Sequence, residues 1–153
     1  MKWLELRVHP PIIFLICTVL IWYISRNQRE FQTEIFFQQK ISVILAILAV
    51  SIVISAINAF QRAQTTVHPN HPEKTTHLIT QGVYRFSRNP MYLALSLLLS
   101  ALSLWLGNLF GFFVVGGFTI YITQFQINPE ERALEENFGQ VYIDYKQQTR
   151  RWI

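Results

Sequence analysis

Four long stretches of this sequence contain no Asp, Glu, Lys or Arg, and this feature restricts the fold more than any other. The stretches run over residues 8–25, 41–61, 89–107 and 108–129. Each is close to the roughly 20 residues that an α-helix needs to cross the hydrocarbon core of a bilayer. Apolar residues make up 51% of the chain and charged residues only 14%, and the apolar ones are gathered into these blocks. The pattern predicts an all-α, polytopic membrane protein with about four transmembrane helices.

The expected helices lie near residues 10–25, 41–61, 89–107 and 108–127, followed by an amphipathic cytosolic helix near 129–147. The dipeptide Gly107-Asn108 is a turn signal, so the third and fourth helices should form a tight hairpin. Small residues should let these two helices approach closely. On the third helix they are Ser96, Ser100, Ser103 and Gly107, and on the fourth Gly111, Gly116 and Gly117. We expect the whole chain, 1–153, to form a single domain.

The first apolar stretch has the cations of a signal peptide before it, but no small-x-small cleavage site follows it. We therefore expect an uncleaved anchor. An even number of crossings places the N-terminus, the 61–88 loop and the tail on one side, which holds ten of the thirteen Lys and Arg residues. The positive-inside rule makes this side cytosolic. A net charge of +4 suits an anionic leaflet and requires no nucleic acid partner.

The tail begins with a pattern that local helix chemistry explains well. Asn128 could cap a helix, Pro129 could open it, and Glu130 and Glu131 would lie near the positive end of its dipole. In this interpretation Glu131 completes a capping box. One apolar face would then hold Leu134, Phe138, Val141, Tyr142 and Tyr145.

The 61–88 loop contains three histidines, His68, His71 and His77, but we predict no metal site. Zinc needs three or four convergent ligands, and neither a nearby Cys nor a paired acidic motif completes the set. The prolines of this loop also make it stiff and extended. Nucleotide-binding glycine loops and a nucleophile elbow are absent from the sequence as well.

At the end of this loop, Asn89 could cap the third helix and Pro90 could open it. Capping does not explain why two arginines and two tyrosines gather where the helix enters the bilayer. These residues are Tyr84, Arg85, Arg88 and Tyr92. Together with the acidic tail, they indicate a polar site at the cytosolic boundary.

Three blocks of sequence carry a resemblance to a known family. They are residues 78–84 (LITQGVY), residues 87–92 (SRNPMY), and Glu130-Glu131 followed by Phe138-Gly139-x-x-Tyr142-x-x-Tyr145-Lys146. In order and spacing they resemble the isoprenylcysteine carboxyl methyltransferase and phospholipid methyltransferase superfamily of integral membrane enzymes. The resemblance covers roughly residues 65–151. The chain departs from the common family pattern at Asn89, where a His is usual, and at Ala94, where a Gly is usual.

The resemblance implies a membrane methyltransferase that uses S-adenosylmethionine and acts on a lipophilic acceptor at the membrane–cytosol interface. By resemblance the acceptor is the carboxylate of an isoprenylcysteine-like substrate. The implied catalytic residues are Arg88, Glu130 and Glu131. The implied cofactor-binding residues are His77, Leu78, Tyr84, Asn89, Pro90, Tyr92 and Glu131.

Other functions stay open at this point. The acceptor could instead be a lipid amine or a small thiol. Certain membrane sterol reductases are similar in their C-terminal halves, so a reductase that uses NADPH is a second alternative. A non-enzymatic membrane adaptor is the third, although an adaptor would not need polar groups on both cytosolic segments.

Overall fold

The computed structural model describes residues 5–27, 37–62 and 78–153, and within these ranges the protein is all-α, as predicted. The elements are α1 (Pro10–Asn27), α2 (Gln38–Arg62), the 3₁₀ turn η4 (Gly82–Arg85), α3 (Pro90–Trp105), α4 (Gly111–Ile122), the π-helix η5 (Thr123–Ile127), α5 (Asn128–Phe138) and α6 (Gln140–Gln148).

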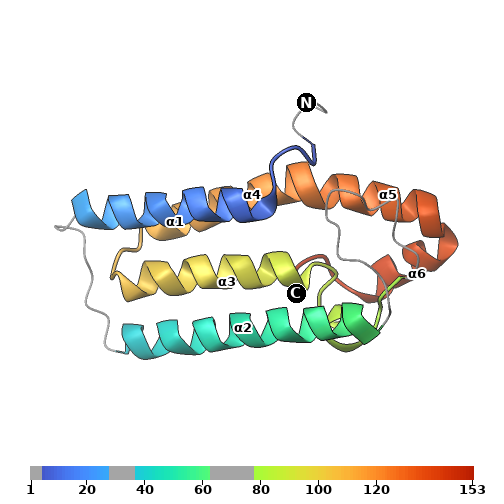
Figure 1. Cartoon of the computed structure of the whole chain (residues 1–153), viewed down its shortest axis with the longest axis horizontal. Coiled ribbons are helices and arrows are strands. Elements are labelled where there is room, and N and C mark those ends of the chain that lie inside the picture. The colour runs from blue at the N-terminus through green and yellow to red at the C-terminus, as the bar shows by residue number, and fades with distance from the viewer. Residues whose placement is uncertain (1–4, 28–36, 63–77) are drawn as a thin grey trace.

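The helices α1 to α4 lie side by side along the length of the molecule (Figure 1). The turn η4, α5, α6 and the C-terminal residues gather at one end of this bundle, which is also where the chain enters α1 (Figure 1). Side chains from α1, α3 and α4 form the buried core, among them Ile21, Leu99, Phe118 and Ile122. The bundle therefore carries its polar segments at one end.

Two of the helices are long and apolar enough to cross a membrane, namely α1 and α2. Both leave large apolar side chains exposed. Val19 of α1 and Ile44 of α2 are each 62% exposed. Such surfaces suit contact with lipid, because hydrocarbon imposes no penalty on exposed apolar groups. The third helix is also apolar but shorter, at 16 residues.

The turn expected at Gly107-Asn108 is present. Gly107 adopts a φ of +66°, which favours glycine. Asn108 is buried, and its carbonyl accepts a hydrogen bond of 2.5 Å from Ser103 Oγ. The predicted small-residue contact is confirmed only close to this turn, where Gly111 packs against Ser103. It is wrong for Gly116 and Gly117, which are exposed and have open space where a Cβ would lie.

Replacing Gly111 with Ala should destabilise the protein. The new Cβ would overlap the side chain of Ser103, whose own Cβ would be only 2.8 Å away. Overpacking of this kind costs about 1–3 kcal/mol. Gly116→Ala, on the same helix, meets nothing within 4 Å and should be neutral or slightly stabilising. Thermal unfolding in detergent measures both variants, and equal midpoints would contradict the predicted contact.

α5 begins at Asn128, but the prediction that Asn128 caps the start of a new, separate helix is wrong. Helical backbone continues from α4 through η5 into α5, and no side chain caps the junction. Pro129 has no N–H to donate to the carbonyl of residue 125, four positions earlier. The Phe125 carbonyl instead accepts a hydrogen bond of 3.0 Å from the backbone N–H of Leu6. The N-terminal segment thus satisfies the polar group that the proline leaves free, and Glu130 and Glu131 are not capping residues.

The prediction of one tail helix over 129–147 is also wrong. The chain breaks at Gly139, whose φ of +54° and ψ of −127° are accessible only to glycine at little cost. After the break, α6 runs in a new direction and buries Tyr142 and Tyr145. Val141 is 63% exposed, so the continuous apolar face expected for the tail does not form.

Candidate functional site

The C-terminal residues lie against the segment that leads into α3. The backbone N–H of Arg88 donates to the carbonyl of Arg150 at 3.0 Å. The side-chain amide of Asn89 donates to the carbonyl of Arg151 at 3.1 Å. Asn89 is the residue before α3, at the position predicted for a cap. The prediction that its side chain caps the helix is wrong, because it makes no capping hydrogen bond. Its hydrogen bond joins two segments that are distant in sequence.

Glu131 is the centre of the site. Its carboxylate is 7% exposed and accepts from two arginines that come from different segments. Arg88 Nη2 lies 2.9 Å from Glu131 Oε1. Arg151 donates through Nη2 to Oε2 at 2.6 Å and through Nε to Oε1 at 3.1 Å, a two-point contact. Charge-assisted bonds of this kind are stronger than neutral ones, so they hold the three segments in a defined geometry.

Arg88 is nearly as buried as its partner, with a side-chain exposure of 9%. It also donates from Nη1 to the carbonyl of Lys146 in α6, at 3.1 Å. Its Nε is buried and has no hydrogen-bond partner among the described residues. A buried guanidinium N–H without a partner is costly, and a bound ligand with an acceptor oxygen would remove that cost.

Glu130 points to a different partner from its neighbour. Its Oε1 accepts a hydrogen bond of 2.5 Å from the hydroxyl of Tyr92 in α3. Burial raises the pKa of Glu130 to about 8, although the Tyr92 hydrogen bond lowers it and the charge of Glu131 raises it further. A carboxyl with a pKa near neutrality can hold or release a proton at physiological pH.

Tyr84, in η4, joins the same region. Its ring packs edge-on against Phe60 of α2 at 5.8 Å, and its carbonyl accepts a 2.6 Å hydrogen bond from the Tyr145 hydroxyl. Burial raises the pKa of Tyr84, with smaller contributions from Tyr145 and from the charge of Glu130. Glu130 and Glu131 of α5 therefore share their surroundings with several phenols, among them Tyr84, Tyr92 and Tyr142.

The structure brings together most of the residues selected from the sequence. Arg88 contacts Glu131, and Tyr92 contacts Glu130. Asn89 joins them through Arg151, and Tyr84 lies near Glu130. Pro90 is buried as the first residue of α3. Leu78 is partly buried, and none of these polar contacts involves it. His77, like His68 and His71, lies outside the described residues.

Sequence reasoning missed Arg151, Lys146 and Tyr145 as members of the site. Arg151 balances Glu131, and Tyr145 ties α6 to η4. Lys146 contributes its carbonyl to Arg88 and its ammonium to an ion pair with Glu135. For Tyr145 and Lys146 the signal was their place in the third block of the family resemblance, and for Arg151 it was the basic pair Arg150-Arg151.

Comparisons with known proteins identify the family of this chain. A sequence profile described as phospholipid methyltransferase matches residues 37–141, more than half of the chain. An uncharacterized protein of Haemophilus influenzae (strain ATCC 51907 / DSM 11121 / KW20 / Rd) is 51% identical over 63 residues, which are 41% of this chain and all of that protein. No solved structure matches. The extent of the profile match confirms the superfamily resemblance, and the chain belongs to the phospholipid methyltransferase family.

Proposed function

We propose that this protein transfers a methyl group from S-adenosylmethionine to a lipid acceptor at the cytosolic boundary of the membrane. Membership of a family of membrane methyltransferases supports the reaction type. One observation carries the location of the site. Glu131 binds Arg88 from the segment before α3 and Arg151 from the C-terminus, so three distant segments form one polar centre.

The polar groups of this centre fit the cofactor. When bound, S-adenosylmethionine supplies an electrophilic methyl group on a sulfonium, together with an ammonium and a carboxylate. Glu131 or Glu130 would accept hydrogen bonds from the ammonium. Arg88, through the Nε that lacks a partner, and Arg151 would bind the carboxylate. Because methyl transfer needs an aligned acceptor and little covalent help from the protein, positioning by these residues is their main task.

In the membrane, the proposed arrangement has four crossings with both termini in the cytosol. Two findings support it: α1 and α2 are candidate spans, and α3 and α4 lie beside them (Figure 1). The start of α1, the turn η4, α5, α6 and the C-terminal residues lie at the same end of the bundle (Figure 1). A water-soluble cofactor would then enter from the cytosol and a lipid acceptor from the bilayer.

For the acceptor, the geometry favours an amine of a lipid headgroup. An acceptor carboxylate, as in an isoprenylcysteine, would compete with the cofactor carboxylate for Arg88, whose guanidinium already bonds to Glu131 and Lys146 and whose remaining Nε is assigned here to the cofactor. An ammonium group must lose a proton before its nitrogen lone pair can bond to the methyl carbon. Glu130, with its raised pKa, can accept that proton. The carboxylate acceptor therefore has less support from the contacts of Arg88.

A titration of the full chain with S-adenosylhomocysteine, followed by calorimetry, tests the cofactor. We expect saturable binding with one site, and no competition from NADPH. Binding of NADPH alone would instead favour a reductase, and binding of neither would favour an adaptor. Transfer of a labelled methyl group to phosphatidylethanolamine in vesicles, compared with farnesylcysteine, tests the acceptor. Labelling of farnesylcysteine alone would overturn the amine assignment.

A further inference from the structure

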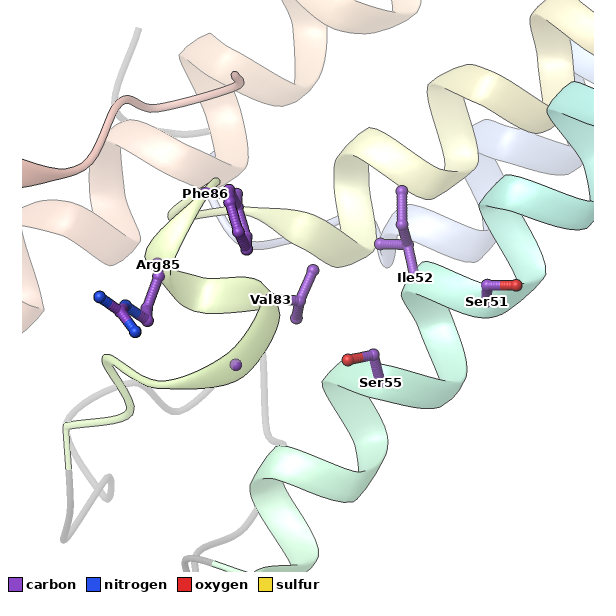
Figure 2. Close-up of a pocket in the computed structure, with 7 residues that line it drawn as sticks. Ser51, Ile52, Ser55, Val83, Arg85 and Phe86 are labelled. Atoms are coloured by element: carbon purple, nitrogen blue, oxygen red, sulfur yellow. The ribbon is translucent and has the colours of Figure 1, made fainter.

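A groove lies between α2 and the turn η4 (Figure 2). It encloses about 490 Å³. The lining comes from two elements: Ser51, Ile52 and Ser55 on α2, and Gly82, Val83, Arg85 and Phe86 at η4. None of the residues assigned to methyl transfer lines it. The groove therefore needs an explanation of its own.

Arg85 and Arg88 are three residues apart in sequence but have different surroundings. Arg88 is buried with Glu131, whereas Arg85 is exposed and has no ionic partner among the described residues. Figure 2 shows the Arg85 side chain extending outward from the turn at one end of the groove. The two arginines noted in the sequence thus lie in different environments. The polar centre accounts for Arg88 but not for Arg85.

The rest of the groove is mainly apolar and belongs to a surface that faces lipid. Ile52 and Val83 face each other across it, and Phe86 is 76% exposed beside them (Figure 2). The two serines differ. Ser51 donates to the Ile47 carbonyl at 2.8 Å, while the hydroxyl of Ser55 has no hydrogen-bond partner within the described part of the chain. The groove thus combines a cation and a hydroxyl that have no partner among the described residues with an apolar wall on a candidate membrane span.

We propose that this groove binds one anionic phospholipid, distinct from the methyl acceptor. The lipid phosphate pairs with the Arg85 guanidinium, which can bond to two of its oxygens, and the Ser55 hydroxyl donates to an ester or phosphate oxygen. The upper part of an acyl chain lies against Ile52, Val83 and Phe86. Arginines at the headgroup level attract anionic lipids, and a cation above an apolar groove complements both parts of such a molecule.

Native mass spectrometry of the full chain in detergent, titrated with phosphatidylglycerol, measures the binding directly. We expect one retained lipid and a binding about fivefold to tenfold weaker in Arg85→Gln. Arg150→Gln removes the same charge from an exposed residue outside the groove and should bind like the wild type. Ser55→Phe fills the groove without changing any charge and should weaken binding to a similar extent. Phosphatidylcholine and inorganic phosphate should compete poorly.

Three results would overturn the proposal. One is unchanged lipid binding in both Arg85→Gln and Ser55→Phe. Another is an equal loss in Arg85→Gln and Arg150→Gln, which would indicate general surface attraction. The last is effective competition by inorganic phosphate, which would indicate a site for free anions. Binding of S-adenosylhomocysteine should stay unchanged in all three variants, so a failure of this proposal is distinguishable from a failure of the methyltransferase assignment.

Discussion

Glu131→Gln is expected to lower the turnover of methyl transfer by about a hundredfold or more. A neutral amide keeps the size of the side chain but removes the charge that holds Arg88 and Arg151 in place. The loss corresponds to about 3 kcal/mol of transition-state stabilisation, a usual value for one misplaced electrostatic group. Turnover in nanodiscs, with S-adenosylhomocysteine affinity measured in parallel, gives the result. Wild-type turnover would show that this carboxylate is only structural.

A matched control and a double variant separate catalysis from stability. Glu136→Gln changes an exposed carboxylate on the same helix and should retain full turnover. Glu131→Gln should also lower the unfolding temperature, because Arg88 is then buried without a balancing charge. Replacing both members of the pair, in Arg88→Met with Glu131→Met, removes the unbalanced charge and should recover part of that stability. It should recover no turnover.

A second large effect is expected at Glu130. Since the pKa of this carboxyl is raised to about 8, turnover should rise with pH and level off above that value as the carboxylate forms. Glu130→Gln should lower turnover by about a hundredfold and remove this rise. Tyr92→Phe removes the hydrogen bond that lowers the pKa of Glu130, so it should move the midpoint of the rise to higher pH. Turnover measured against pH for the wild type, Glu130→Gln and Tyr92→Phe tests these expectations.

The same group makes a prediction about stability that needs no substrate. Between its ordinary pKa of 4.5 and its raised value of about 8, Glu130 holds more protons in the folded protein than in the unfolded chain. The free energy of unfolding should therefore fall as the pH rises through this window, and Glu130→Gln should reduce that dependence. Identical pH dependence in the variant and the wild type would mean that the carboxyl is solvated and cannot be the proton acceptor.

Sequence periodicity predicted the bundle well and the tail poorly. The helix class and the turn at Gly107 follow from segment length and turn residues. Charge distribution placed the segment before α3 and the acidic tail on one side of the membrane, and the family resemblance implied that Arg88 and the acidic pair belong to one site. The prediction for the tail was wrong because Asn128-Pro129-Glu130-Glu131 has the residue types that usually begin a helix. A helix can continue through such a sequence when another segment binds the freed carbonyl, and here Leu6 does so.

The roles of the two glutamates show the same limit. The local sequence does not distinguish Glu130 from Glu131, because both are adjacent acidic residues near a helix end. In the structure, Glu131 pairs with two guanidinium groups and Glu130 pairs with a phenol. Their chemistry differs because their partners lie 20 to 43 residues away. No local pattern contains such information.

The amino-acid sequence by itself determined that this chain forms apolar helices with its charges at their ends, since hydrocarbon excludes charge and favours helical backbone. It also indicated which polar segments share a side of the membrane. Only the tertiary structure decided that the C-terminal residues bind the segment before α3, that Arg151 completes the ion-pair centre and that Arg85 stays exposed outside it. Those outcomes depend on the break at Gly139 and on long-range hydrogen bonds, whose energies exist only once the helices have packed.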